Sequence, residues 1–187
     1  LFLEAFHMDQ VHFLMNRMRP LTEEQRAQQE TYEVMIDRRS ARVPLQQILG
    51  SQEFMGLEFY VNEHVLIPRQ DTETLVELVL SEHKEKNISL LDVCTGSGCI
   101  AISLAKLGGY TDVTALDLSE EALKVARSNG EKLLDQPVKF IKSDMFSALN
   151  PEKQYNVIVS NPPYIPSQVI EGLEPEVKDH EPRMALD

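Results

Sequence analysis

Apolar residues recur at intervals of three and four between residues 9 and 18, which is typical of one face of an amphipathic helix. This stripe consists of Val11, Leu14, Met15 and Met18. Thr22 and Gln25 then form a capping box, which predicts a second helix running to about residue 39. A short third helix is expected over residues 44–49, ended by Gly50. We expect the methionines to fill a core, although a methionine-rich helix can also serve as a docking surface.

The hydrophobic period changes from helical to alternating between residues 54 and 67, which predicts a β-hairpin. The apolar positions of its first arm are Leu57, Phe59 and Val61. Asn62-Glu63 is expected to form the turn, and residues 65–67 the second arm. A helix capped by Asp71 or Thr72 should follow. Its apolar face would consist of Leu75, Leu78 and Val79.

From residue 89 onward, short apolar runs alternate with helical stretches. The predicted strands are residues 90–93, 113–116, 138–141 and 157–159. Helices are expected over residues 99–107 and after a cap at Ser119. This order predicts an α/β fold in which helices cover both faces of a parallel sheet. Ligands of such sheets bind beyond the carboxyl ends of the strands.

Composition narrows the possible functions. The chain has 187 residues and a formal net charge of −12, which disfavours a surface that follows nucleic-acid phosphates. No apolar run approaches the roughly 20 residues of a membrane-spanning helix, so we expect a soluble protein. The two cysteines, Cys94 and Cys99, suit a reducing compartment and are expected to be packing residues rather than a redox pair.

A glycine turn follows the first strand of the predicted sheet. Gly96, Gly98 and Ala101 have the spacing G-x-G-x-x-A, which joins a strand to a helix in nucleotide-binding α/β units. Glycine lets the backbone pass close to a ligand, and the following helix offers free N–H groups. Glycine pairs also serve plain tight turns, so the context must decide.

Two aspartates lie at the ends of the next two strands. Asp117 follows Gly98 by about 20 residues, the position from which a carboxylate accepts hydrogen bonds from a ribose diol. It could equally serve as a helix N-terminal carboxylate before Ser119. Asp144 could accept from an exocyclic amine of adenine, or it could only end its strand.

The tetrapeptide Asn161-Pro162-Pro163-Tyr164 follows the last predicted strand. Two successive prolines cannot donate ladder hydrogen bonds and fix the backbone, so they form a rigid arm. On this arm the Asn161 side-chain oxygen and the Pro162 carbonyl can act as two acceptors, and Tyr164 offers a flat apolar wall. Such a set is suited to a planar NH2 group. A plain strand end with a surface tyrosine is the alternative.

These motifs together resemble the class I S-adenosylmethionine-dependent methyltransferases that methylate amino groups. The resemblance is closest to the HemK/PrmC-type protein-glutamine methyltransferases. It rests on Leu91–Gly98, Asp117-Leu118-Ser119, Asn161–Tyr164, Pro44–Gly50, Glu53–Leu57, Ile67-Pro68-Arg69 with Thr72-Glu73, and Glu181–Leu186. It implies a Rossmann-like methyltransferase sheet, an N-terminal helical substrate-docking domain (residues 1–50), a β-hairpin linker (51–70) and a methyltransferase domain (71–187).

The resemblance also implies an activity, which is N5-methylation of the glutamine side chain in the Gly-Gly-Gln motif of class 1 peptide-chain release factors. S-adenosylmethionine would be the methyl donor and S-adenosylhomocysteine the product. The implied catalytic and substrate-binding residues are Asn161, Pro162, Pro163 and Tyr164. The implied cofactor-binding residues are Cys94, Thr95, Gly96, Ser97, Gly98, Asp117, Leu118, Asp144, Met145 and Asn161. A cytoplasmic monomer with no metal, membrane or direct nucleic-acid partner is expected.

Two departures from the family pattern stand out. Gln70-Asp71 replaces a Pro-Glu pair, which keeps an acid but removes a proline. The family also continues past Asp187 through further strands, so we expect the methyltransferase domain to be incomplete at its C-terminus. The alternative functions are an adenine-N6 methyltransferase acting on DNA or RNA, a non-catalytic cofactor-binding partner protein and a nicotinamide dehydrogenase. The proline arm has no role in hydride transfer, which counts against the last.

Overall fold

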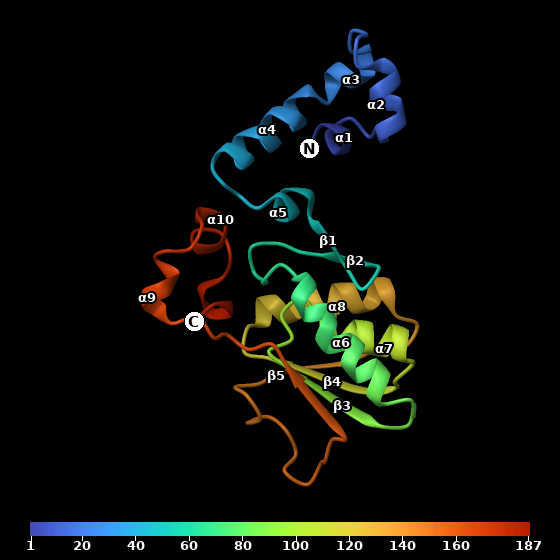
Figure 1. The fold of residues 1–187 in the computed structure, drawn as a ribbon, viewed down its shortest axis with the longest axis vertical. Coiled ribbons are helices and arrows are strands. Elements are labelled where there is room, and N and C mark those ends of the chain that lie inside the picture. Colours follow the sequence, from blue (N-terminus) through green and yellow to red (C-terminus); the bar gives the residue numbers. More distant parts are fainter.

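The computed structural model describes residues 1–187 and shows a group of helices followed by a layered α/β unit (Figure 1). Five short helices make up the N-terminal part. They are α1 (Phe2–Ala5), α2 (Gln10–Asn16), α3 (Glu23–Ala27), α4 (Gln29–Ser40) and α5 (Leu45–Leu49). The capping box at the start of α3 is confirmed, since Thr22 Oγ1 accepts from Gln25 N and Gln25 Oε1 accepts from Thr22 N. The predicted single helix is two helices, which meet at Gln28.

The methionine-bearing stripe, which runs along α2 and past its end at Asn16 to Met18, faces solvent, so the prediction that it fills a core is wrong. Met15 and Met18 are 75% and 90% exposed. The opposite face of α2 is the packed one, because the ring of Phe13 lies 5.3 Å from that of Phe2. Tyr32 on α4 completes this aromatic cluster, at 5.5 Å from Phe2. Aromatic rings bury more area than the methionine stripe and decide which face of the helix turns inward.

The hairpin consists of β1 (Ser51–Phe54) and β2 (Leu57–Tyr60), which pair in antiparallel fashion. Its turn is Met55-Gly56, where both φ angles are positive, as a tight two-residue hairpin requires. The chain does turn after Asn62, where Val65 N donates to the Asn62 carbonyl, but no strand follows, so the predicted second arm over residues 65–67 is wrong. The alternation of apolar and polar residues continues past Tyr60 although the strand ends there. Val61 and Val65 are apolar because they pack in one buried cluster with residues of helix α8 (Glu120–Leu133).

Four parallel strands form the central sheet in the order β5-β4-β3-β6. They are β3 (Ser89–Val93), β4 (Asp112–Asp117), β5 (Lys139–Lys142) and β6 (Val157–Ser160). Helices α6 (Gln70–Glu82), α7 (Cys99–Gly108) and α8 cover one face (Figure 1). The other face packs against Leu149 and Tyr155 of the segment between β5 and β6. The predicted parallel α/β fold is confirmed, whereas the predicted helices on both faces are not found.

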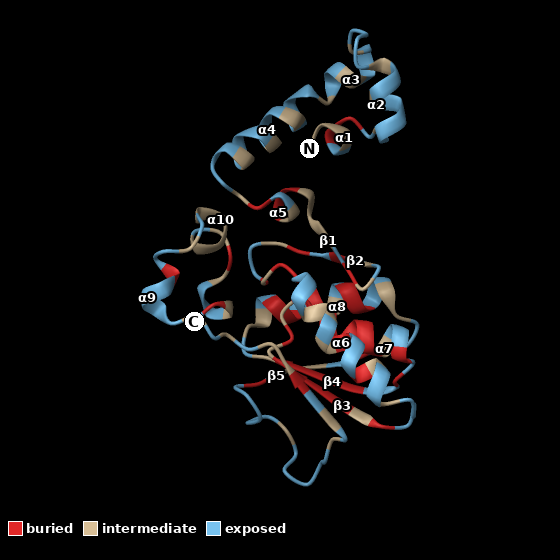
Figure 2. Cartoon of the chain, viewed as in Figure 1, coloured by how far each residue is buried: buried red, intermediate tan, exposed pale blue.

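The main core lies between the sheet and helices α6 and α7, where Figure 2 shows buried residues concentrated. Val76 and Val79 are the buried residues of α6, while Leu78 is exposed, so the predicted apolar face is only partly correct. The helix also begins without the predicted side-chain cap, because Arg69 occupies that position.

The last part of the chain holds three short helical turns. They are α9 (Ser167–Ile170), α10 (Pro175–Lys178) and the 3-10 turn η1 (Arg183–Ala185). This part reaches back to the N-terminal helices, since Arg39 Nη2 lies 2.9 Å from Glu176 Oε1 and Gln47 Nε2 donates to the carbonyl of His180. None of the helices has both the length and the apolar character needed to cross a bilayer.

Candidate functional site

The glycine turn lies at the carboxyl end of β3 and leads directly into α7. Gly98 has a φ of +82°, and a Cβ there would lie 2.8 Å from Ile102 Cδ1 and 3.2 Å from Ala126 Cβ. A Cβ on Gly96, whose φ is +56°, would meet no atom within 4 Å. Gly98 is therefore required by packing between α7 and α8, whereas Gly96 leaves open space above the turn.

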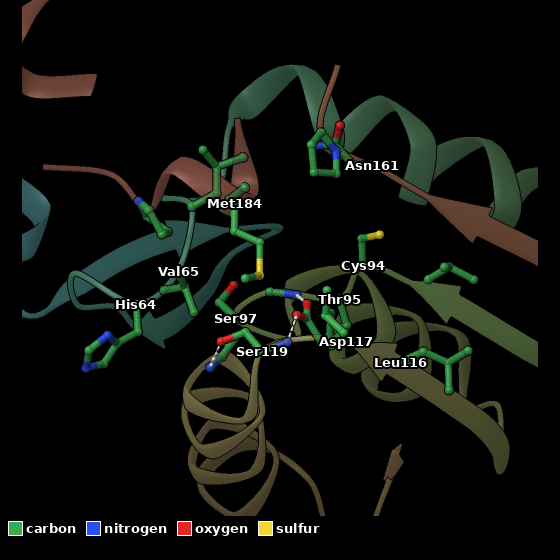
Figure 3. Close-up of a pocket in the computed structure, with 18 of the residues that line it drawn as sticks. His64, Val65, Cys94, Thr95, Ser97, Leu116, Asp117, Ser119, Asn161 and Met184 are labelled. Carbon is green, nitrogen blue, oxygen red and sulfur yellow. Dashed lines mark hydrogen bonds between the residues drawn. The ribbon is translucent and has the colours of Figure 1, made fainter. Parts of the chain in front are cut away.

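Asp117 at the end of β4 ties the turn to the next strand. Gly96 N donates to Asp117 Oδ2 at 2.8 Å and Ser119 N donates to Oδ1 at 2.9 Å (Figure 3). Ser119 in turn caps α8 by accepting from Ala122 N. Each carboxylate oxygen has a second lone pair, so Asp117 can organise the loops and still accept hydrogen bonds from a ligand. The two interpretations of Asp117 are thus compatible with each other.

A cavity of about 430 Å³ opens above these loops, within the range of small-molecule sites. It is lined by most of the residues that the sequence predicts to bind cofactor or substrate. Those that line it are Cys94, Thr95, Gly96, Ser97, Asp117, Leu118, Asp144, Met145, Asn161 and Pro163. Gly98, Pro162 and Tyr164 do not line it. Figure 3 shows Asn161 on the side of the cavity opposite Asp117.

The character of the walls suits a nucleoside with a polar tail. Ser97 lines the cavity, and its buried hydroxyl lies behind the wall near the thiol of Cys99. The Asp117 carboxylate lies on the same wall. Apolar side chains that could enclose a flat ring complete the lining. They include Val65, Leu66, Ile100, Leu116 and Leu118.

The loop after β5 brings Asp144 and Met145 to the cavity. Ser143 N donates to the carbonyl of Asp117, and Ser143 Oγ donates to the carbonyl of Met145 at 2.7 Å. Met145 adopts a φ of +45°, an uncommon value for a residue other than glycine. These bonds hold the loop in a tight fold that keeps both side chains at the cavity wall.

Asn161 reaches the same cavity because β6 lies beside β3. Ser160 is paired with Val93 in the parallel register, and Ser160 Oγ donates to the Val93 carbonyl at 2.7 Å. Asn161 and Cys94 consequently leave neighbouring strands at the same edge of the sheet. Asn161 Nδ2 donates to Thr72 Oγ1 at 3.2 Å, which leaves the side-chain oxygen without a partner in the protein.

A second cavity, of about 470 Å³, adjoins the first. It is lined by Tyr164, which is 78% exposed, and by apolar residues of α6 and of the C-terminal segment. Residues common to both cavities are Leu66, Arg69, Thr72, Asn161 and Ala185. Asn161 therefore lies where the two spaces meet, with the glycine turn in one and Tyr164 in the other.

Burial controls the titratable groups around the turn. It raises the pKa of the Cys94 thiol, with a further contribution from the charge of Asp117. Burial also raises the pKa of Cys99 to about 12 and that of Asp92 to about 7, the latter opposed by a hydrogen bond from Thr95 Oγ1. Both thiols are neutral near pH 7 and are poor nucleophiles. The chain contains no group of three or more His, Cys, Asp or Glu residues placed to hold a metal ion.

Several lining residues were not singled out as site residues from the sequence. From the connector they are His64, Val65, Leu66, Pro68 and Thr72, and from the C-terminal segment Pro182, Met184, Ala185 and Asp187. The sequence leaves open whether Arg69 and Glu73 are solvated charges or lie near a ligand, and of these two Arg69 lines the cavity. Arg69 Nη2 lies 2.8 Å from both oxygens of Glu181, which joins the two segments. The signal that could have found them is the proline beside a charged residue in each segment, Pro68-Arg69 in one and Glu181-Pro182 in the other, because Arg69 and Glu181 have opposite charges.

Comparison with known proteins gives two family matches. Residues 70–172 match the methyltransferase small domain family, and residues 1–50 match the PrmC N-terminal domain. A release factor glutamine methyltransferase from Geobacter sulfurreducens is 41% identical over 183 residues, which cover 98% of this chain and 62% of that protein. Its counterpart from Koribacter versatilis is 42% identical over 187 residues, covering 100% of this chain and 65% of that protein.

The chain thus spans less than two thirds of the length of these two relatives. Among solved structures, a ribosomal protein L11 methylase from Lactobacillus delbrueckii subsp. bulgaricus superposes with a TM-score of 0.45 and 26% identity. The superposition covers 63% of this chain and 58% of that one.

Proposed function

The chain belongs to the methyltransferase small domain family, and from this premise we propose that it transfers a methyl group to the side-chain amide nitrogen of a glutamine. The methyl donor is S-adenosylmethionine and the released product is S-adenosylhomocysteine. The acceptor is the glutamine of the Gly-Gly-Gln motif in class 1 peptide-chain release factors. The names of the two relatives, each about 40% identical, support this choice of acceptor.

The observation that carries the proposal is the position of Asn161 at the junction of two cavities. One cavity contains the open glycine turn, the Asp117 carboxylate and apolar walls, which fit a nucleoside cofactor. The other contains Tyr164 and opens to solvent, as entry of a protein side chain requires. A group held by Asn161 can therefore face the first cavity while its chain remains in the second.

The donor supplies a methyl group already activated on a sulfonium, so the protein mainly has to position the acceptor. An amide nitrogen is a weak nucleophile because its lone pair is delocalised into the carbonyl. The free oxygen of Asn161, which lines both cavities, accepts a hydrogen bond from the acceptor amide and directs nitrogen electron density toward the first cavity. The Pro162 carbonyl is the proposed second acceptor, and Pro162 itself lines neither cavity. These bonds strengthen as the nitrogen becomes pyramidal, so they act mostly in the transition state. The bond from sulfur to the methyl carbon breaks as the nitrogen–carbon bond forms, and the nitrogen then loses one proton to solvent through the second cavity.

We propose that residues lining the first cavity bind the separate parts of the cofactor. Asp117 receives the ribose hydroxyls, and Leu118, Asp144 and Met145 receive the adenine. The methionine part lies against residues 94–98, where Gly96 leaves open space. Tyr164 packs on the amide plane of the acceptor from the second cavity.

We also propose that residues 1–50 form a docking domain for the release factor, residues 51–70 a hairpin linker and residues 71–187 the methyltransferase domain. The exposed stripe on α2 supports a docking role for the first segment. The protein is proposed to act as a cytoplasmic monomer, where release factors function and where free cysteines such as Cys94 and Cys99 persist. The net charge of −12 disfavours nucleic acid as a direct partner.

Methyl transfer from radiolabelled S-adenosylmethionine tests the proposal. The full-length protein is incubated separately with an intact class 1 release factor, with duplex DNA and with transfer RNA. We expect label in the release factor and none in either nucleic acid. Label in nucleic acid alone would support the adenine methyltransferase instead, and label in no substrate, with cofactor still bound, would support the non-catalytic partner protein.

A further inference from the structure

The carboxamide of Asn161 has two chemically different ends. Its oxygen only accepts hydrogen bonds and its NH2 only donates them. A glutamine side-chain NH2 can be held by the oxygen, whereas an Asn161 NH2 turned toward it would place donors against donors. The proposed function therefore requires one of the two orientations of the Asn161 carboxamide. A contact that fixes this orientation is part of the reaction's machinery.

Thr72 makes that contact from a different part of the fold. Asn161 Nδ2 donates to Thr72 Oγ1 at 3.2 Å, across a separation of 89 residues in the sequence. Both residues line both cavities, so the bond lies at the junction itself. The bond uses one of the two NH2 hydrogens, with the Thr72 hydroxyl as acceptor, and leaves the carboxamide oxygen free.

Thr72 is itself well fixed. It lies in the first turn of α6, where its backbone N donates to the Arg69 carbonyl at 3.0 Å. The Arg69 side chain is in turn held by Glu181, whose side chain is 1% exposed. Threonine in a helix is restricted to two main χ1 rotamers, and the bond to Asn161 is made in one of them.

We propose that Thr72 is a positioning residue, which binds the NH2 of Asn161 and thereby presents the Asn161 oxygen to the acceptor amide. This inference rests on the proposed glutamine methylation. It assigns to Thr72 no contact with the reacting atoms. Its hydroxyl, rather than its size, carries the role.

Three variants of the full-length protein separate the effect of the Thr72 hydroxyl from the effect of the shape of its side chain. Thr72→Val keeps the shape and removes the hydroxyl, Thr72→Ser keeps the hydroxyl, and Thr74→Val makes the same change at an exposed site on the same helix. We expect Thr72→Val to lower kcat for the release factor by about three- to tenfold with KM changed by less than about twofold, the pattern of an interaction made mainly in the transition state. Thr72→Ser and Thr74→Val should stay within about twofold of the wild-type kcat.

An unchanged kcat in Thr72→Val would overturn the proposal. Equal losses in Thr72→Ser and Thr72→Val would overturn it as well, because the hydroxyl would then not matter.

A second measurement does not depend on activity. In ¹⁵N-labelled protein, the side-chain NH2 signals of Asn161 are identified by their loss in Asn161→Ala. Thr72→Val should shift these signals and Thr74→Val should not. Asn161 NH2 signals that do not shift in Thr72→Val would overturn the inference, whatever the enzyme methylates. Wild-type protein that methylates no release factor would instead refute the proposed function, while the signals would still decide whether Thr72 orients Asn161.

Discussion

Arg69 Nη2 lies 2.8 Å from both carboxylate oxygens of Glu181, although 112 residues separate them in the sequence. Arg69 precedes α6, and Glu181 precedes the turn that brings Pro182, Met184 and Ala185 to the first cavity. Burial raises the pKa of Glu181, and the charge of Arg69 opposes this rise. The pair thus fastens the C-terminal segment over the site at the cost of a buried charge.

Replacement of Arg69 by Met should destabilise the protein more than replacement of Glu181 by Gln. The first change leaves a buried carboxylate without its cation, which costs about 1 to 3 kcal/mol here because Arg69 is partly exposed. The second leaves a neutral side chain and should cost less than about 1 kcal/mol. Urea unfolding measures both. The double variant should be more stable than the sum of the two losses predicts, since the orphaned charge is then absent, and strict additivity would contradict this account.

The two glycines of the turn should respond differently to alanine. Gly98→Ala places a Cβ 2.8 Å from Ile102 Cδ1 at a positive φ, so it should cost about 2 kcal/mol or more of stability. Gly96→Ala meets no neighbouring atom and should cost only about 1 kcal/mol, from its positive φ. Its Cβ would enter the space assigned to the cofactor, so S-adenosylhomocysteine should bind more weakly. Thermal unfolding measures the stability of each variant, and titration calorimetry measures its affinity for S-adenosylhomocysteine. A larger loss of stability in Gly96→Ala, with unchanged affinity, would refute the assignment of the space above Gly96 to the cofactor.

Asp92 should make stability fall as pH rises. Its pKa is raised by burial from 3.8 to about 7, so between these values the folded state keeps a proton that the unfolded state has lost. The stabilisation is complete below pH 3.8 and is lost as pH rises through about 7, at most roughly 4 kcal/mol for a shift of about three units.

Asp92→Asn removes this dependence and keeps an oxygen for the Thr95 hydroxyl. Unfolding free energies of variant and wild type, measured by urea at several values across this range, should diverge in favour of the variant as pH rises. Parallel curves would show that Asp92 is ionised in the folded protein.

Asp117→Asn should loosen the two loops that it joins. The carboxylate accepts from Gly96 N and Ser119 N, whereas an amide would turn its own NH2 toward one of these donors. We expect a loss of about 1 to 2 kcal/mol in stability and a weaker Kd for S-adenosylhomocysteine by about tenfold or more. Asp135→Asn is the matched control, since Asp135 is 96% exposed and only faces Lys106 at 3.5 Å. Equal behaviour of the two variants would contradict the role given to Asp117.

The strands and the site at their carboxyl ends could be predicted because local signals and tertiary structure agree there. Buried parallel strands appear as continuous apolar runs, and β3, β4, β5 and β6 all lie within a residue or two of their predicted bounds. The residues at the strand ends, Gly96, Asp117 and Asn161, line one cavity because parallel strands end at one edge.

The remaining features depended on contacts that no local pattern records. The periodicity of α2 does not show which face packs, because that depends on the contact of Phe13, on the other face, with Phe2. The pattern also places the hairpin turn too late, because Val61 and Val65 are buried like strand residues without being paired in a strand. Thr72 and Glu181 gain their roles only from partners that lie 89 and 112 residues away.

Mass spectrometry of an intact release factor, digested after incubation with full-length enzyme and S-adenosylmethionine, tests the central claim most directly. We predict a gain of one methyl group on the glutamine of the Gly-Gly-Gln motif, and its loss with Asn161→Ala protein that still binds S-adenosylhomocysteine. An unmodified glutamine, or equal methylation by Asn161→Ala, would contradict the proposal that Asn161 presents this amide for methyl transfer.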